Sequence, residues 1–319
     1  MTEKAPIKVS VCIPAYKNTE YLKRVLDSLA AQDFTSWEVI ITDDSPDNEV
    51  EELARSYKKL LPLVYYRNTP AHGMPANWNT CYDHARGQYI KIMHDDDWFT
   101  RPDAISKMAA ALDANPDCDL VFSAFRECFI DHPGKVNEVH CSSFYRQLLK
   151  QDPVHLFQKN FIGPPSAVMH RNNPAYRYDV RLQWLVDMDF YINLLRHKPG
   201  FVYLDEALVN IGISDLQLTK SCFGVRTVEI PEYFYLLRKV GENALQSLYV
   251  FDFFWRLMRN LGIREEKELY EAGMEGETPA VVKYILKRQR PFSFKLLKNG
   301  AINKILTGLS FTGRPRKNG

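Results

Sequence analysis

The stretch YIKIMHDDDW (residues 89–98) joins a short apolar run to three consecutive carboxylates, and the fold is decided here. Two earlier apolar runs have the same form, KVSVCI (8–13) and WEVIIT (37–42). Between them, apolar residues recur at helical spacing over residues 22–29. Strands and helices that alternate in this way predict a parallel sheet with helices on both faces.

Acidic clusters follow two of these predicted strands, Asp43-Asp44 after the second run and Asp95-Asp96-Asp97 after residues 89–93. In open parallel sheets, ligands bind beyond the carboxyl ends of the strands. Adjacent carboxylates repel one another unless a cation neutralises them, and hard divalent cations prefer oxygen ligands. Taken alone, the triplet is equally compatible with an acidic turn before the helix that Pro102 opens. Asp43-Asp44 alone is better explained as a solvated turn.

The composition of the 319-residue chain is typical of a globular protein, with 45% hydrophobic and 25% charged residues. Its six cysteines are scattered and form no Cys-x-x-Cys pair. We find no signal peptide at the N-terminus, so we expect reduced thiols and a cytoplasmic protein without structural zinc.

The C-terminal stretch 281–319 contains ten Lys or Arg residues and no Asp or Glu, together with many apolar residues. A basic, amphipathic terminus predicts contact with an anionic membrane surface. A solvated tail is an equally good interpretation, and nucleic acid is not expected. No stretch reaches the roughly 18 uncharged apolar residues of a membrane-spanning helix.

Four motifs together resemble those of glycosyltransferase family 2. VSVCIPAYKN (9–18) is similar to the family's VSVIIPAYN, and EVIITDDSP (38–46) to its EIIVVDDGS. Residues 68–87 resemble NxGxxxxxNxGxxxAxGEY, and HDDDWFTRP (94–102) resembles DxDDxxxP. The resemblance extends more weakly to about residue 220. It implies the GT-A fold, an α/β fold with a Rossmann-like, mostly parallel sheet flanked by helices, here followed by a C-terminal helical extension.

The resemblance also implies a role for each matching position. Asp97 would bind a divalent ion, Mn²⁺ or Mg²⁺, and Asp187, near the start of the predicted helix 186–197, would deprotonate the acceptor hydroxyl. Backbone N–H groups hold an aspartate ionised at a helix start, so such a base depends on close positioning. The nucleotide-sugar donor would contact Pro14, Ala15, Tyr16, Asp44, Asn79, Asp95 and Asp96.

The acceptor side is implied by a Gly-Pro-Pro-Ser turn and by the start of the same helix. The residues concerned are Gly163, Ser166, Trp184 and Asp189, the last also the fallback base. A structural turn at Gly163, a buried aromatic at Trp184 and ordinary first-turn helix carboxylates are the alternatives.

Two positions depart from the family pattern. Asn77 stands where many members carry Arg, and Ser214 replaces the His of the family's RxHxxQxS stretch. That metal ligand is therefore absent unless Asp215 substitutes for it. We interpret His94 and His72 as polar neighbours rather than as ligands.

We therefore expect residues 1–220 to form the catalytic domain, with a nucleotide-sugar half (1–102) and an acceptor half (103–220). Residues 221–319 should form a mainly helical region with a basic tail. The expected activity is inverting, metal-dependent sugar transfer to a glycan or lipid-linked acceptor in cell-surface polysaccharide synthesis. The expected location is the cytoplasm or the inner face of the cell membrane. The alternatives are a nucleotidyltransferase, which would normally carry a glycine-rich loop after the first strand, and a non-catalytic binding protein.

Overall fold

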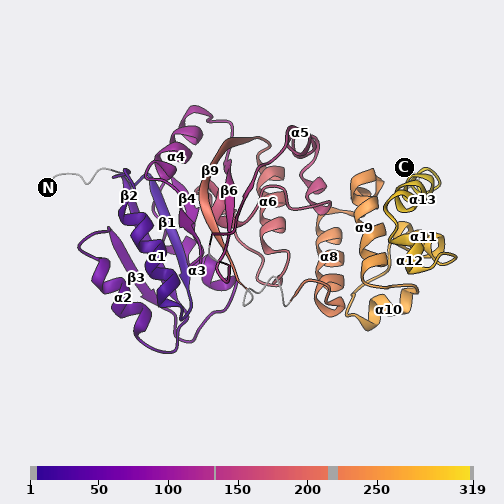
Figure 1. Cartoon of the computed structure of the whole chain (residues 1–319), viewed down its shortest axis with the longest axis horizontal. Coiled ribbons are helices and arrows are strands. Elements are labelled where there is room, and N and C mark those ends of the chain that lie inside the picture. Colours follow the sequence, from indigo (N-terminus) through magenta and orange to yellow (C-terminus); the bar gives the residue numbers. More distant parts are fainter. Residues whose placement is uncertain (1–5, 133, 215–221, 317–319) are drawn as a thin grey trace. The chain divides into compact units, whose positions relative to one another are not determined.

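The computed structural model describes residues 6–132, 134–214 and 222–316 (Figure 1). Its strands are β1 (Val9–Ala15), β2 (Trp37–Asp43), β3 (Leu63–Arg67), β4 (Tyr89–Ile92), β5 (Trp98–Phe99), β6 (Leu120–Phe129), β7 (Val136–Val139), β8 (Val168–Arg171) and β9 (Phe201–Ile213). Within the described ranges they form one nine-stranded sheet in the order β3-β2-β1-β4-β8-β6-β9-β5, with β7 paired to β6. The predicted α/β fold class is confirmed.

The sheet is mixed, and its parallel part is the one that the three apolar runs predict. β1 lies between β2 and β4 and is parallel to both, and β3 is parallel to β2. β8 pairs antiparallel with β4 and β6, and β5 pairs antiparallel with β9. The carboxyl ends of β1, β2 and β4 therefore lie side by side at one edge of the sheet.

β6 and β9 extend well beyond the apolar runs 120–122 and 201–204 that predict them. They pair in parallel along their length, from Leu120 opposite Phe201 to Phe129 opposite Ile213. The outer part of this ladder is only partly buried and contains polar residues such as Arg126. Backbone pairing therefore continues where the apolar signal ends.

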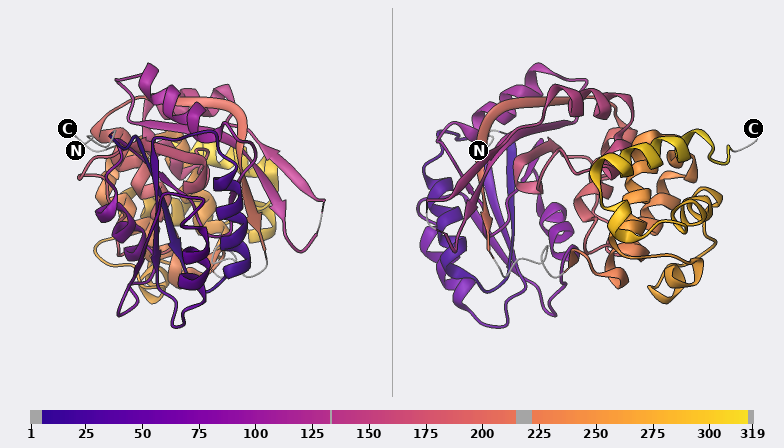
Figure 2. Two further views of the ribbon diagram at one scale, coloured as in Figure 1. Left: turned by 90° about the vertical axis from the view of Figure 1, so that its left-hand side faces the viewer. Right: turned by 45° about the vertical axis from the view of Figure 1, so that its right-hand side comes forward.

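Helices cover both faces of the sheet (Figures 1 and 2). One face packs against α1 (Thr19–Ala30), α2 (Glu49–Tyr57) and α4 (Ala104–Ala114), and the other carries α3 (Ala76–His84) and α6 (Val186–His197). The alternation of β1 explains this division: Val11 and Ile13 enter the first core, whereas Cys12 faces Cys81 of α3. A further helix, α5 (Ser143–Gln151), precedes the 3₁₀ segment Pro153–Phe157.

An asparagine side chain caps the start of α1. The side chain of Asn18 accepts a hydrogen bond from the Tyr21 backbone N–H at 3.1 Å. This bond satisfies one of the four amide donors that a helix N-terminus leaves unpaired. The apolar residues of α1 at helical spacing are all buried.

The chain forms two compact units, Met1–Pro153 with Phe161–Asp215, and Val154–Asn160 with Leu216–Gly319. The second unit is helical as predicted, with a buried aromatic core that includes Phe234, Phe254 and Trp255. Its helices are α8 (Arg226–Val240), α9 (Leu248–Asn260), α10 (Glu266–Glu271), α11 (Ala280–Gln289), α12 (Phe294–Leu297) and α13 (Gly300–Thr312). The basic C-terminal stretch is therefore folded as far as α13 reaches, and the solvated-tail interpretation is wrong there.

All six cysteines are free thiols. None of the described helices has both the length and the apolar character needed to cross a bilayer.

Candidate functional site

Hydrogen bonds donated by backbone N–H groups join the end of β1 to the end of β2 and to the loop after β4. The Asp44 N–H donates to the Ala15 carbonyl at 3.1 Å, and the Tyr16 N–H donates to Asp95 Oδ2 at 3.2 Å. Pro14 and Ala15 are buried, whereas the Tyr16 side chain is 55% exposed. The structure thus brings both predicted acidic clusters to the two sides of β1, with Tyr16 open to solvent between them.

The carboxylate of Asp44 is nearly buried and organises the loop that follows β3. Its Oδ1 accepts from Asn68 Nδ2 at 2.8 Å and from the His72 N–H at 3.0 Å, and its Oδ2 accepts from the Gly73 N–H at 2.8 Å. Two carboxylate oxygens offer about four acceptor positions, so capacity for a donor from a ligand remains. Asn77, which replaces the family Arg, is buried beneath this loop and accepts from Asn68 at 2.9 Å.

Burial and mutual repulsion disfavour the ionised form of two carboxylates in the acidic triplet. Burial, and then repulsion by Asp96, raises the pKa of Asp95 to about 7. The same two causes raise the pKa of Asp97, which is 2% exposed, against the opposing effects of hydrogen bonds from Ser166 and the Gly212 N–H. A cation bound here would stabilise the ionised carboxylates.

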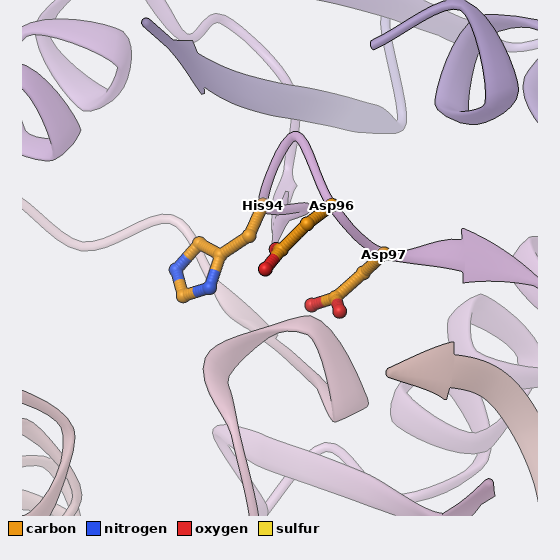
Figure 3. Close-up of side chains that lie close together, drawn as sticks. All are labelled: His94, Asp96 and Asp97. Atoms are coloured by element: carbon orange, nitrogen blue, oxygen red, sulfur yellow. The ribbon is translucent and has the colours of Figure 1, made fainter. Parts of the chain in front are cut away.

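His94, Asp96 and Asp97 form a group that could hold a metal ion. One ligand atom from each lies within 4.8 Å of the others, and Figure 3 shows the three side chains leaving the loop toward the same side. Within the described ranges, His94 Nε2 is buried without a hydrogen-bond partner. Burial lowers the pKa of His94 and favours the neutral imidazole that ligates metals. His94, which we expected to be a polar neighbour, therefore belongs with the triplet, and the donor set suits a divalent ion such as Mn²⁺.

Three residues, Lys91, Ser166 and Gly212, support this group, and none of them was expected next to the acidic triplet. Lys91 of β4 is fully buried, and its Nζ donates to the carbonyls of Ile92 and Ser166. Burial lowers the pKa of Lys91 to about 7, although Asp97 opposes the shift. Ser166, predicted on the acceptor side, lies against the triplet, and its hydroxyl accepts from the His94 N–H at 3.0 Å.

Gly212 of β9 is the third supporting residue, and the acidic loop approaches it too closely for any side chain. A Cβ placed there would lie 2.5 Å from the Asp96 carbonyl oxygen. The Gly212 N–H donates to Asp97 Oδ1 at 3.1 Å. Only glycine lets the backbone of β9 reach the Asp97 carboxylate in this way.

Asp187 lies in the first turn of α6, as predicted, and its Oδ1 accepts from the Met188 N–H at 2.9 Å. Two buried tyrosines, Tyr178 and Tyr191, are close enough for Asp187 to raise the pKa of each, after the larger effect of burial. The Tyr191 hydroxyl donates to the Gly163 carbonyl at 3.1 Å. Gly163 has φ +101°, and a Cβ there would lie 2.6 Å from the Phe125 ring, which explains the glycine structurally.

Three other predicted site residues have contacts that describe their surroundings. Asp189 is fully buried and accepts from Asn193 at 3.1 Å. Asn79 both donates to and accepts from the backbone of Tyr178, each at 2.9 Å, so its amide joins α3 to the segment before α6. Trp184 is half-buried just before α6.

Trp78 connects the acidic group to the surroundings of Asp187. Its ring centroid lies 4.6 Å from that of His94 and 4.9 Å from that of Tyr178. Tyr178 in turn stacks on Phe190 of α6 at 4.4 Å. The predicted metal-binding residues and the predicted base therefore belong to one connected region of the first unit.

Ser214, which replaces the His of the family pattern, directly follows β9 and is nearly buried. Asp215, its suggested substitute as a ligand, lies outside the described residues.

A separate open depression of about 740 Å³ is lined by residues of both charges, among them Arg101, Arg126 and Glu206. Arg101 and Glu206 already pair with each other at 2.6 Å, so this depression offers no unpaired chemistry comparable to that of the triplet.

Comparison with known proteins gives a consistent result. The model of "Glycosyl transferase family 2" matches residues 10–177. An uncharacterized glycosyltransferase of Methanocaldococcus jannaschii is 26% identical over 78% of this chain and 79% of its own length. The poly(ribitol-phosphate) beta-N-acetylglucosaminyltransferase TarS of Staphylococcus aureus is 29% identical over 84% of this chain and 42% of its own length.

Solved structures share the fold over nearly the whole chain. TarS 1-349 of S. aureus in complex with UDP-GlcNAc has a TM-score of 0.64 at 16% identity and covers 97% of this chain and 93% of that one. A mannosyltransferase of Pyrobaculum calidifontis in complex with GDP-Man and Mn²⁺ has a TM-score of 0.53 at 14% identity, over 98% of this chain and 77% of that one. The chain spans 64% of the first matched curated relative, an uncharacterized protein of Mycobacterium tuberculosis that is 29% identical over 61% of this chain.

Proposed function

This chain belongs to glycosyl transferase family 2, and from that premise we propose that it transfers a sugar from a nucleotide-diphosphate donor with inversion at the anomeric carbon. We assign the chemistry to the first compact unit, which holds the acidic triplet and Asp187. The single observation that carries the proposal is the convergence of one ligand atom each from His94, Asp96 and Asp97 directly after β4, one of the parallel strands. The nucleotidyltransferase and non-catalytic alternatives are set aside because the family is one of glycosyltransferases.

The donor is proposed to lie along the edge between Asp44 and the triplet. Tyr16 is exposed there and offers a ring face to a base, while Asp44 keeps an acceptor position for a base or ribose donor. Asp97, Asp96 and His94 would hold the divalent ion, which supplies positive charge to the diphosphate leaving group. The complexes of related folds with UDP-GlcNAc, and with GDP-Man and Mn²⁺, support this assignment.

In the proposed reaction, Asp187 acts on the acceptor. Its carboxylate takes the proton of the acceptor hydroxyl while that oxygen forms a bond to the anomeric carbon and the bond to the diphosphate breaks. The Met188 N–H orients the carboxylate, and the two buried tyrosines Tyr178 and Tyr191 are close enough to feel its charge. Asp189 is fully buried, which makes it the weaker candidate.

The acceptor is proposed to be a glycan or lipid-linked polymer of the cell surface, bound from the side of Trp184 and Asp187. The likeness to TarS, whose name gives a poly(ribitol-phosphate) acceptor, supports a polymeric substrate of this kind. We place the reaction at the inner face of the cell membrane, where a lipid-linked acceptor would be presented.

A screen of nucleotide sugars by thermal shift, with and without Mn²⁺, tests the proposal. A donor that binds the native state raises Tm, by an amount set by RT ln(1 + [L]/Kd). We expect one donor to raise Tm only with Mn²⁺ and to be consumed when a suitable acceptor is added. Asp97→Asn should abolish both the Mn²⁺-dependent Tm shift and turnover. Wild-type turnover in the presence of a chelator would contradict the metal assignment.

A further inference from the structure

Helix α13 (Gly300–Thr312) has its polar side buried and its apolar side exposed. Its most buried residues are Asn303, Thr307 and Ser310. Ile305 and Leu309, one turn apart, are 63% and 61% exposed. A surface helix of a globular protein normally has the opposite arrangement.

The buried polar side of α13 makes specific contacts with the rest of the helical unit. Asn303 Oδ1 accepts from Trp255 Nε1 at 3.0 Å, and the Ser310 hydroxyl accepts from Arg288 at 3.4 Å. Phe311 packs edge-on against Phe251 of the unit's core. These contacts fix the rotation of α13, so Ile305 and Leu309 cannot turn inward without breaking them.

The charged side chains from α12 to the end of α13 are all basic. Lys295, Lys298 and Lys304 are exposed, and Leu296 of the neighbouring helix α12 is a further apolar side chain that is 37% exposed. No acidic residue occurs from 281 to the end of the chain. Figure 2 shows α13 along the outside of the helical unit.

We propose that this basic-apolar face, Leu296, Ile305 and Leu309 with Lys295, Lys298 and Lys304, docks the protein on an anionic lipid surface. Apolar side chains on one helix face would enter the boundary of the acyl chains, and the lysines would pair with anionic headgroups. The positive charge favours lipid over a second copy of the same face, because two copies would bring like charges together. The inference rests on the membrane location given in the proposed function and names the surface that would make the contact. Lipid binding by this face can be measured independently of the donor chemistry.

Vesicle flotation tests the face with a matched pair of variants. Ile305→Ser/Leu309→Ser removes two exposed apolar side chains of α13, and Leu60→Ser/Val180→Ser removes two that are 69% and 62% exposed in the first unit. We expect wild type and the control to float with vesicles of phosphatidylcholine and phosphatidylglycerol but hardly with phosphatidylcholine alone. The α13 variant should bind at least roughly tenfold more weakly, because it loses the burial of two apolar side chains in the lipid boundary.

Three outcomes would overturn the proposal: no flotation of wild type, equal flotation of the α13 variant, or a dimer in sedimentation that Ile305→Ser/Leu309→Ser dissociates. The nucleotide-dependent Tm shift is measured on the same samples. Loss of flotation with an intact shift supports the docking face independently of the active site. Absence of any shift in wild type would count against the proposed donor chemistry and leave the flotation result standing.

Discussion

Asp187 and Asp189 lie two residues apart in α6, yet their surroundings suit them to different tasks. Asp187 is partly exposed and is oriented by the Met188 N–H, whereas Asp189 is fully buried and bonded to Asn193. The proposed base must reach the acceptor hydroxyl, which favours the more exposed carboxylate. Sequence spacing alone leaves the choice between Asp187 and Asp189 as the candidate base open, and their different burial at the start of α6 separates them.

Replacing Asp187 by Asn should separate binding from chemistry. We expect turnover to fall by roughly 10²–10⁴-fold, because a general base is lost while shape is kept. The donor-dependent Tm shift should remain at the wild-type value. Initial rates of transfer, measured with thermal shift on the same preparation, check both parts.

Asp189→Asn serves as the control for that experiment. Its buried position predicts a lower Tm but near-normal turnover of the folded enzyme. A fully active Asp187→Asn variant beside an inactive, folded Asp189→Asn variant would assign the base to Asp189 instead.

At the scale of elements, β9 supports the acidic loop from a distant part of the sequence. Its Gly212 N–H reaches Asp97, and its backbone passes so close to Asp96 that a Cβ has no room. Lys91 on β4 and Ser166 before β8 complete this support from two further elements. The candidate metal site formed by His94, Asp96 and Asp97 therefore depends on strand pairing as well as on its own residues.

Gly212→Ala tests this dependence. The added methyl would lie 2.5 Å from the Asp96 carbonyl, so the acidic loop must move and the Asp97 carboxylate loses its backbone donor. We expect Mn²⁺ affinity to fall by roughly tenfold or more, the equivalent of one lost hydrogen bond to a charged group. Calorimetric titration of Mn²⁺ measures the change.

Gly308→Ala on α13 is the matched control, because a Cβ there meets nothing within 4 Å. It should leave Mn²⁺ affinity unchanged and raise stability by about 0.5–1 kcal/mol, since alanine is the better helix residue. Unchanged Mn²⁺ binding by Gly212→Ala would show that the loop adjusts without cost and would contradict the proposed support by β9.

At the scale of the whole molecule, the triplet should make stability depend on pH and on metal. Burial and Asp96 raise the pKa of Asp95 to about 7, so between about pH 4 and pH 7 the folded state binds more protons than the unfolded state. The contribution of this group to stability is therefore present below about pH 4 and is lost as the pH rises toward 7. A bound cation should restore it.

Thermal unfolding across this pH range checks the sign. We expect the Tm gain from Mn²⁺ to be larger at pH 7.5 than at pH 5, because protons compete with the metal for the carboxylates at low pH. The ionisation penalty at Asp95 corresponds to a few kcal/mol, at about 1.4 kcal/mol per pKa unit. A Tm gain that is the same at both values, or its persistence in Asp97→Asn, would be inconsistent with a metal at the triplet.

Local sequence patterns predict the parallel half of the sheet, the acidic edge and the start of α6. These features depend on local patterns: apolar runs that pair as strands, carboxylates directly after them, and an aspartate in the first turn of a helix. In each case residues close together in the sequence are enough to predict the element, and the tertiary structure adds only where that element lies in the fold.

Contacts between distant segments set the surroundings of His94, Ser166 and Gly212, and the outward face of α13. The surroundings of His94, the reach of Ser166 and the backbone approach at Gly212 depend on segments more than 70 residues apart meeting at one loop. The exposure of Ile305 and Leu309 depends on which side of α13 fits Trp255 and Arg288. Long-range packing sets these contacts, and no local periodicity encodes them.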